Sequence, residues 1–545
     1  MSELAALAQS HLLVSGCAVG IGVALGLPLA ILSARSGRVR TPVLGLAGLI
    51  QTVPALALLA LFYPALLILG RATGLAIPAL GFLPALIALA LYALLPILRN
   101  GVAALRAIDP GVIEAADGLG MTARQRLAMV ELPLGAPVIL AGIRTAAVWT
   151  IGAATLATTV GQPSLGNLIF SGLQTENWQR VLTGCAAAAA LALAVDGLLA
   201  LVESGLARRS RRRWGLGLAG IGLALLAALV PLERSGGETV VIGAKNFSEQ
   251  YILASAIERR LRAAGYRTER RDNLGSTVAY QALAAGDIDV YVDYGGTLWA
   301  NILGRADTPP AEEMRRRLAA DLRARDGVLV MGPLGFENAY ALAMRRSRAA
   351  ALGVRTLDDL ARVAPRLTLS ADLEFLSRPE WRSVAARYGL RFAGQRSYSP
   401  TFMYRALADG SVDAIAAFSS DGRIAALDLV TLADPRRALP SYEALLLVSP
   451  RRAADARLTG SLAPLVGSIP IERMREANLM VDRDADKRTP EEAARWLDTA
   501  ADQSRRPTVQ SNTGPVTGPR EGHGKRPGLL CAPRRRAVAG RRAGR

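Results

Sequence analysis

The 545-residue sequence has little of the chemistry on which most enzymes depend. It contains three cysteines and two histidines, and aromatic residues make up 5% of the chain. The cysteines, Cys17, Cys185 and Cys531, lie far apart, so the sequence offers neither a disulfide framework nor a Cys-x-x-Cys metal site. The phosphate-binding pattern GxxxxGK[ST] is missing, and the nearest Gly-Lys pair, Gly524-Lys525, lacks the flanking residues. We therefore expect no enzyme, no cofactor and no ATP hydrolysis by this chain.

What the sequence has instead is long apolar runs. Hydrophobic residues make up 51% of the chain, and the mean hydropathy is +0.26, which is too high for an ordinary soluble protein. Four uncharged runs reach the ~18 residues that a membrane-spanning helix needs, and two more carry one charge each. We expect the single charges, Arg144 and Asp196, to face the interior of the helix bundle in a structural role. The six runs are residues 12–34, 41–70, 72–98, 134–157, 181–202 and 214–232.

The arginines predict how these spans are oriented. Positive residues are retained on the cytoplasmic side of a membrane. The loops after the first, third and fifth runs hold twelve arginines together, whereas the alternate loops hold Arg71 and Arg180. This pattern places the amino terminus and everything after the sixth run outside the cytoplasm. Arginines at 208–213 before an apolar run also resemble a signal peptide, but no clean cleavage site precedes Glu238, so we expect an uncleaved anchor.

The loop between the third and fourth runs carries a distinctive motif. It contains Glu114-Ala115-Ala116, then Gly120, then Leu132-Pro133. We expect a short helix that opens at Asp109-Pro110, a break at the glycines and a second amphipathic piece that runs to Pro133. The order of these features resembles the EAA loop in the membrane subunits of binding-protein-dependent ABC importers.

This resemblance covers roughly residues 10–205 and includes segments 51–54 and 95–100, which look most like the osmoprotectant branch of the family. It implies an all-α, MetI-like bundle of transmembrane helices. It also implies that the loop docks on a separate ABC ATPase subunit, through residues that include Glu114, Ala115, Ala116 and Gly120. Because such importers need two permease units, a homodimer is the simplest assembly.

From residue 238 to about 500 the pattern changes to short apolar runs that alternate with amphipathic helices. We expect strands at residues 239–244, 288–292 and 412–418, and a helix over 248–265 with Ser248 as its N-cap. A length of about 260 residues suits two α/β lobes with a ligand cleft between them.

Several strings in this half follow one another in a recognisable order, at residues 243–250, 273–277, 286–297, 335–342 and 419–424. The series resembles the binding proteins for glycine betaine, choline and related quaternary ammonium solutes, which implies a type II, two-lobed periplasmic-binding-protein fold. A trimethylammonium head has no N–H donors, so a protein holds it with several aromatic faces. A carboxylate on the same solute requires a cation or a hydroxyl donor.

The resemblance implies seven ligand-binding residues. The aromatic candidates are Tyr294, Tyr340, Phe418 and Tyr442, and the candidates for the anionic end are Lys245, Thr297 and Arg378. Taken singly, each tyrosine is more often a packing residue and Lys245 could be a surface lysine, but the motif context favours ligand contact. Phe418 stands where the family commonly has tyrosine, Glu337 where asparagine is usual, and Gly295-Gly296 where Thr-Gly is common, which leaves the exact solute open.

These observations predict a multidomain chain. Residues 1–207 are the transmembrane permease, 208–237 an arginine cluster with the sixth span, 238–502 the extracytoplasmic binding domain and 503–545 a disordered basic tail with no role in nucleic-acid binding. The predicted function is the permease and receptor of an ABC importer for quaternary ammonium compatible solutes, in a bacterial inner membrane. Two alternatives stay open: import of another cationic or amino-acid-like solute, and a membrane-anchored solute sensor.

Overall fold

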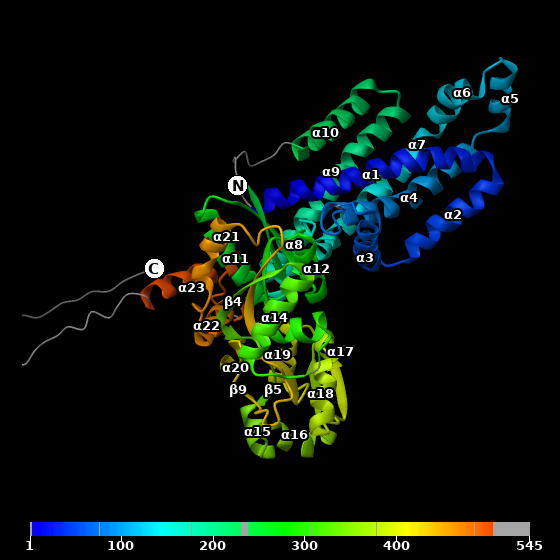
Figure 1. Cartoon of the computed structure of the whole chain (residues 1–545). Coiled ribbons are helices and arrows are strands. Elements are labelled where there is room, and N and C mark those ends of the chain that lie inside the picture. Colours follow the sequence, from blue (N-terminus) through cyan, green and yellow to red (C-terminus); the bar gives the residue numbers. More distant parts are fainter. Residues whose placement is uncertain are drawn as a thin grey trace, which may run out of the picture. The chain divides into compact units, whose positions relative to one another are not determined.

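The computed structural model describes residues 3–75, 77–175, 177–229, 238–305, 307–377, 379–483 and 485–504 (Figure 1). Residues 1–502 belong to one compact unit, which contains both the helical part and the α/β part. The basic tail after residue 504 and the segment 230–237 lie outside the described residues, so the predictions made for them stay predictions.

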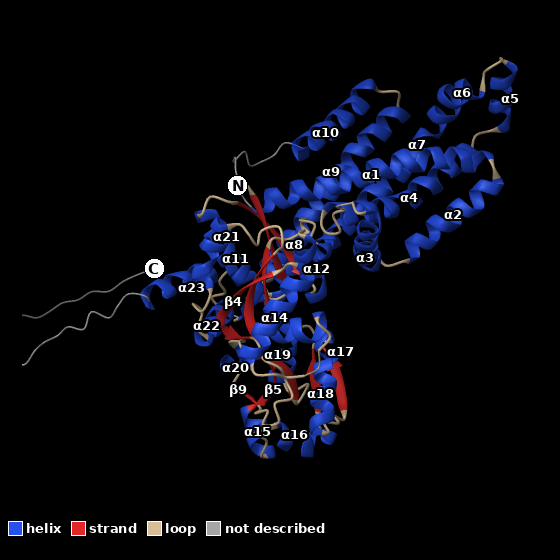
Figure 2. Cartoon of the chain, in the orientation of Figure 1, coloured by secondary structure: helices blue, strands red, loops and turns tan. Residues whose placement is uncertain are grey.

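The part before residue 230 is helical (Figure 2). Among the described residues, five helical segments are long and apolar enough to cross a membrane, or six when one bent pair counts as a span. The helices are α1 (Glu3–Arg35), α2 (Gly37–Thr52), α3 (Ala55–Thr73), α4 (Phe82–Arg106), α5 (Pro110–Gly118), α6 (Ala123–Arg126), α7 (Leu132–Ala154), α8 (Gly166–Gln174), α9 (Trp178–Ala207) and α10 (Arg211–Leu229).

Two of the predicted spans differ from the structure. The second is not one helix, because α2 and α3 meet at an angle of 99°. Val53 and Pro54 are extended at the break, since proline lacks an N–H and disfavours helical backbone in the residue before it. The third span does not begin at residue 72. Gly74 and Gly81 have φ angles of 70° and 80°, and α4 starts only after them.

The two charges inside predicted spans pair with each other, as a bundle-facing position requires. Arg144 on α7 donates from Nε and Nη2 to the two carboxylate oxygens of Asp196 on α9, both at 2.9 Å. Its Nη1 donates at 2.6 Å to Glu203, which lies nearer the C-terminal end of α9 than Asp196 does. Each of these partly exposed charges therefore has a partner, and the three residues connect α7 to α9.

The loop at residues 109–133 has the predicted helix, glycine turn and helix. The Asp109 side chain accepts a hydrogen bond from the N–H of Gly111 at 2.7 Å and caps α5, with Pro110 in the first turn. Gly120 has a φ of 78°, so the chain turns where a side chain would be strained. The short helix α6 then continues through a π-helical turn, Leu127–Glu131, into α7.

The part after residue 238 contains two five-stranded sheets, each in its own lobe. The first has the order β2-β1-β3-β10-β4 and the second the order β7-β6-β8-β5-β9. The strands are β1 (Thr239–Lys245), β2 (Arg267–Leu274), β3 (Val290–Tyr294), β4 (Leu329–Glu337), β5 (Tyr340–Arg345), β6 (Thr368–Ala371), β7 (Gly394–Ser397), β8 (Ala414–Phe418), β9 (Leu429–Thr431) and β10 (Glu443–Val448).

The chain crosses between the lobes twice, from β4 to β5 and from β9 to β10. In the first sheet β1 pairs in parallel with β2 and β3, whereas β10 runs antiparallel between β3 and β4. In the second sheet Tyr340 of β5 lies directly opposite Phe418 of β8. This is the two-lobed α/β architecture that the sequence predicts.

Helices cover both sheets. Their bounds are α11 (Ser248–Ala263), α12 (Ser276–Ala285), α13 (Gly295–Thr297), α14 (Ala311–Asp326), α15 (Arg346–Leu352), α16 (Leu357–Val363), α17 (Leu373–Ser377), α18 (Pro379–Tyr388), α19 (Pro400–Ala408), α20 (Arg423–Ala426), α21 (Ala456–Leu462), α22 (Ile471–Asp482) and α23 (Pro490–Ser504). The prediction that Ser248 caps α11 is wrong. Phe247 occupies the N-cap position, and the Ser248 hydroxyl donates instead to Asp482 at 2.5 Å.

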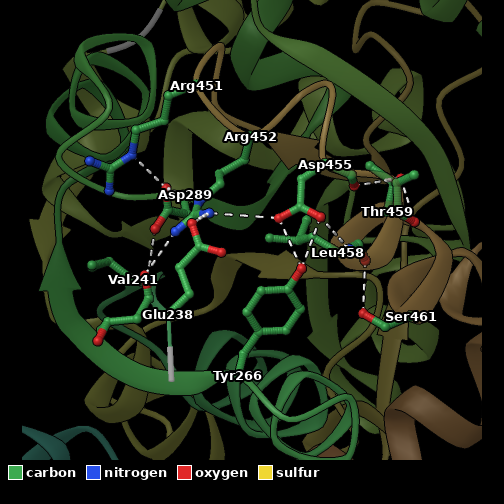
Figure 3. Close-up of polar contacts among 12 residues, drawn as sticks. Glu238, Val241, Tyr266, Asp289, Arg451, Arg452, Asp455, Leu458, Thr459 and Ser461 are labelled. Carbon is green, nitrogen blue, oxygen red and sulfur yellow. Dashed lines mark hydrogen bonds and ion pairs between the residues drawn. The ribbon is translucent and has the colours of Figure 1, made fainter. Parts of the chain in front are cut away.

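A polar cluster fastens the beginning of the α/β part to the end of β10 (Figure 3). Arg452 contacts Glu238, Asp455 and Asp289, the last at 3.4 Å. Arg451 donates to the same oxygen of Asp289 at 2.7 Å. Asp289 is fully buried, so the two guanidinium groups supply the charge that a carboxylate at such a site needs.

Candidate ligand site

A cavity of about 600 Å³ lies among the carboxyl ends of strands from both sheets. Lys245 ends β1, Tyr294 ends β3 and Phe418 ends β8, and all three line it. Ligands of α/β proteins commonly bind at this edge of a parallel sheet. The other described lining residues are Gln174, Asn246, Phe247, Ser276, Thr297, Asn338, Tyr340, Asp372, Leu373, Ser377, Ser397, Tyr398, Ser399 and Tyr442.

Five aromatic rings form a continuous group at this cavity. The ring of Phe247 stacks with Tyr294 at 6.1 Å and with Phe418 at 6.4 Å between centroids. The ring of Tyr340 lies 5.1 Å from Phe418 and meets Tyr442 edge-on at 5.5 Å. Such a group offers several π faces within one cavity, the arrangement that attracts an organic cation without N–H donors.

Hydrogen bonds from their hydroxyl groups hold two of these tyrosines in place. The Tyr294 hydroxyl donates to Glu249 at 2.6 Å, and the Tyr442 hydroxyl donates to Glu380 at 2.9 Å. Burial, with the nearby Glu249 carboxylate, raises the pKa of Tyr294 well above its ordinary value, so this phenol stays protonated. Both rings therefore keep a fixed orientation, and the Tyr294 ring keeps a neutral π system.

Lys245 reaches the cavity already paired. Its ammonium group contacts the buried carboxylate of Asp293 and lies 5.1 Å from the centroid of the Tyr294 ring. The Tyr291 hydroxyl donates to the other oxygen of Asp293 at 2.6 Å. One face of Tyr294 is thus covered by a cation of the protein itself. Phe247 and Phe418 are the two rings of the group that are only partly buried, so they have more exposed surface for a ligand.

The cavity lining also includes polar residues. They are Ser276, Asp372, Ser377, Ser397, Tyr398 and Ser399. Ser276 begins α12, and Asp372 accepts a hydrogen bond from the N–H of Phe375 at 2.9 Å, which caps α17. The cavity therefore combines an aromatic group with hydroxyl and carboxylate groups that can bind the polar part of a solute.

The structure brings six of the seven predicted ligand residues to one cavity. They are Lys245, Tyr294, Thr297, Tyr340, Phe418 and Tyr442. Arg378 lies outside the described residues. The roles of these residues in binding a solute stay predictions.

Sequence reasoning missed several lining residues. Phe247 directly follows Lys245-Asn246 at a strand end, and that position was a usable signal for it. The serines around residue 398 and Gln174 at the end of α8 gave no signal, because nothing local in their sequence ties them to the cavity.

Two family models match this chain. Residues 22–208 match the inner membrane component of binding-protein-dependent transport systems. Residues 238–499 match the substrate binding domain of ABC-type glycine betaine transport systems. An osmoprotectant import permease protein of Salmonella typhimurium is 40% identical over 196 residues, which are 36% of this chain and 88% of that protein. The chain belongs to the ABC import permeases and carries a betaine-type binding domain.

Other similar proteins cover both halves or the binding domain alone. An ergothioneine transport permease and binding protein of Helicobacter pylori is 28% identical over 441 residues, which are 78% of this chain and 77% of that protein. The crystal structure of a glycine betaine/carnitine/choline ABC transporter is 25% identical and covers 48% of this chain and 98% of that chain, with a TM-score of 0.43. The import permease is thus a multi-pass membrane protein, and permeases of this family work with an ATPase subunit and carry a solute.

The loop at 109–133 presents the residues predicted to meet that ATPase. Glu114 and Ala115 are exposed on α5, Ala116 is buried, and Gly120 lies in the turn that follows. Leu119 at the tip is 79% exposed, although it is a large apolar residue.

Proposed function

We propose that this protein is the permease and receptor of an ABC importer for quaternary ammonium compatible solutes such as glycine betaine, choline, carnitine and proline betaine. The observation that carries the proposal is the group of five aromatic rings around one cavity. Each contact between a cation and an aromatic face contributes about 0.5 to 2 kcal/mol, so several faces together can hold a trimethylammonium head.

The opposite end of a betaine is a carboxylate, and Lys245 and Thr297 are our candidates for it, with Arg378. Lys245 remains a donor although it contacts Asp293, because an ammonium group has three N–H bonds. The pair leaves the cavity nearly neutral at this point, which suits a zwitterionic solute better than a free anion.

The size and polarity of the cavity support larger members of the class as well. A volume of about 600 Å³ is ample for glycine betaine, and the hydroxyl groups around Tyr398 can bind additional polar atoms. Ergothioneine, named in the Helicobacter pylori relative that matches both halves, is a trimethylammonium betaine with a sulfur-bearing imidazole ring. It therefore belongs in the set of candidate solutes.

In the proposed cycle the binding domain is extracytoplasmic, and solute closes its two lobes. The closed domain delivers solute to the membrane helices, and ATP-driven motion of a separate subunit reaches them through Glu114, Ala115, Ala116 and Gly120. Because receptor and pore share a chain, the receptor has a high effective concentration at the pore. Two copies of the chain form the permease dimer within the lipid bilayer.

Calorimetry on the full chain in lipid nanodiscs tests the proposal with glycine betaine, choline, carnitine, proline betaine and ergothioneine. We expect at least one solute to bind, and we expect Tyr340→Ala to weaken that binding at least about tenfold. Phe402→Ala is the control, since Phe402 is 38% exposed on α19 and is not among the residues that line the cavity. An equal loss in both variants would contradict the aromatic site.

The alternatives give different results. Failure of all five solutes to bind would favour import of another cationic or amino-acid-like solute. Binding without solute uptake, measured in membranes that also contain the cognate ATPase, would favour a membrane-anchored sensor.

A further inference from the structure

Glu249 is a buried acid directly behind the aromatic rings, in the first turn of α11. The residue is only 3% exposed to solvent. One oxygen accepts hydrogen bonds from the Tyr294 hydroxyl at 2.6 Å and from Asn338 Nδ2 at 3.0 Å. The other accepts from Asn478 Nδ2 at 2.9 Å, and the Ser420 side chain is also hydrogen-bonded to the carboxylate.

Three of these partners are, or lie next to, three different rings of the aromatic group. Tyr294 is itself one of these rings, at the end of β3. Asn338 lies two residues before Tyr340, at the crossover from β4 to β5. Ser420 lies two residues after Phe418, at the end of β8. One carboxylate therefore touches the backbone segments from which three of the five rings project.

The residues between these partners and the rings have little freedom. The N–H of Ala339 donates to Ser419 Oγ at 2.9 Å, and the N–H of Ser419 donates to the carbonyl oxygen of Ala339 at 2.8 Å. Asn478 Nδ2 also donates to the carbonyl oxygen of Ser420 at 2.9 Å. A displacement of Asn338 or Ser420 is thus transmitted to the adjacent ring.

We infer that Glu249 is a positioning residue that sets the spacing of Tyr294, Tyr340 and Phe418 and so determines how well the site discriminates a trimethylammonium head. The inference rests on the proposed function, because it concerns selectivity at the same cavity. Glu249 belongs to the first lobe and Ser420 to the second, so the same carboxylate also connects the lobes behind the cavity.

The chemistry of the site requires a carboxylate at this position. Every neighbour that the hydrogen bonds identify is a donor: a phenol, two amide NH₂ groups and a hydroxyl. A glutamine of the same shape would turn its own NH₂ toward one of these donors and leave a buried group unpaired. An aspartate would keep the charge but retract it by one methylene, away from the crossover.

The test compares Glu249→Gln and Glu249→Asp with Glu258→Gln on the same helix. Glu258 pairs with Arg262 at 2.7 Å and accepts from Thr268 at 3.0 Å, away from the cavity lining. Calorimetry on the full chain measures affinity for glycine betaine and for dimethylglycine, which differ by one methyl group on nitrogen. We expect the wild-type preference for glycine betaine to fall at least about fivefold in Glu249→Gln, less in Glu249→Asp and not at all in Glu258→Gln.

The ratio of the two affinities distinguishes a positioning role of Glu249 from general destabilisation of the protein. Partial unfolding would lower the affinity for both ligands by the same factor and leave the ratio unchanged. An unchanged ratio in Glu249→Gln, including one that results from an equal loss of affinity for both ligands, would overturn the inference. Failure of all five quaternary ammonium solutes to bind contradicts the proposed function, not the inference. If the wild type binds neither glycine betaine nor dimethylglycine, near-ultraviolet circular dichroism tests the inference alone. We expect the tyrosine signal to change in Glu249→Gln and to stay unchanged in Glu258→Gln; two unchanged spectra would overturn it.

Discussion

Gly296 lies against the ring of Tyr442 so closely that no larger residue fits. A Cβ at this position would lie 2.6 Å from Cζ and 2.7 Å from both Cε atoms of that ring. The ring has little room to move, because its hydroxyl is bound to Glu380 at 2.9 Å and its edge packs on Tyr340 at 5.5 Å. Gly296 is therefore a packing requirement of the aromatic site in this chain.

We expect Gly296→Ala to displace Tyr442 and to weaken quaternary ammonium binding at least about tenfold, an effect of about 1.4 kcal/mol. Gly275→Ala is the matched control, because Gly275 has a φ of −70° and open space where its Cβ would lie. Calorimetry on both full-length variants gives the comparison. Similar affinities in the two variants would show that Tyr442 moves without cost and is not part of the binding surface.

At the scale of single residues, the sequence motifs predicted which tyrosines lie at the cavity. They did not predict the hydrogen bonds that fix those tyrosines in place. Tyr294 and Tyr340 were found from short strings around them, whereas Glu249 was read only as part of such a string. Its partner Asn478 lies 229 positions away. Contacts between residues so far apart depend on how the lobes fold together, which local patterns do not encode.

A chain of charged residues connects α5 to α1. Arg126 donates from Nη1 to both oxygens of Asp117 at 2.5 Å and 2.6 Å, and from Nε to Glu131 at 2.8 Å. Arg35, the last residue of α1, lies 3.6 Å from the same glutamate. Two nitrogens of the Arg126 guanidinium group thus bind two different acids, and charge-assisted hydrogen bonds of this kind are stronger than neutral ones.

If α5 is the helix that meets the ATPase, Arg126→Ala should leave solute binding unchanged and lower ATP-driven uptake at least about fivefold. The reason is that losing a charge-assisted contact of about 1 kcal/mol or more shifts a conformational equilibrium by that factor. Arg126→Lys should restore part of the uptake, and Arg124→Ala on the same short helix serves as the control. Uptake and solute affinity are measured in the same membranes, and a parallel loss of both would argue against a role in coupling.

At the scale of helices, apolar run length predicted α7 and α9 to within about five residues at each end, whereas α1 begins nine residues before the predicted run. It failed where one proline breaks a helix and others do not. Pro54 separates α2 from α3, whereas Pro28, Pro64 and Pro96 lie inside helices. A proline in a transmembrane helix is tolerated when neighbouring helices or side chains satisfy the freed carbonyl, so the outcome depends on packing and not on the residue itself.

At the scale of the whole molecule, local sequence patterns predicted the division into two parts but not the order of the strands in the sheets. The composition shift near residue 238 correctly separated the helical part from the α/β part. The sheet order does not follow from such patterns, since β10 inserts between β3 and β4 although about a hundred residues separate it from β4 along the chain. That insertion brings Tyr442, just before β10, beside Tyr294 at the end of β3, and so completes the aromatic group.

Asp482 is a second buried acid at the junction of the two lobes. It ends α22, its side chain is 7% exposed, and it accepts from Ser248 on α11 at 2.5 Å. Arg423 on α20 faces it at 3.9 Å, and Asp421 lies beside that guanidinium group. Burial raises the pKa of Asp482 from 3.8 to about 6; Arg423, Ser248 and Lys487 oppose this rise, and Asp421 adds to it.

This shift predicts how stability depends on pH. Because the folded state holds the Asp482 proton more tightly than the unfolded state does, its contribution favours folding at low pH and is lost as the pH rises through about 6. Asp482→Asn should therefore be more stable than the wild type above about pH 6, with the difference shrinking as the pH falls toward about 4. Thermal unfolding of both full-length proteins across this range measures the difference, with Asp428→Asn on an exposed turn as the control. A constant difference at every pH would mean that Asp482 keeps its charge in the folded protein and that Arg423 outweighs its burial.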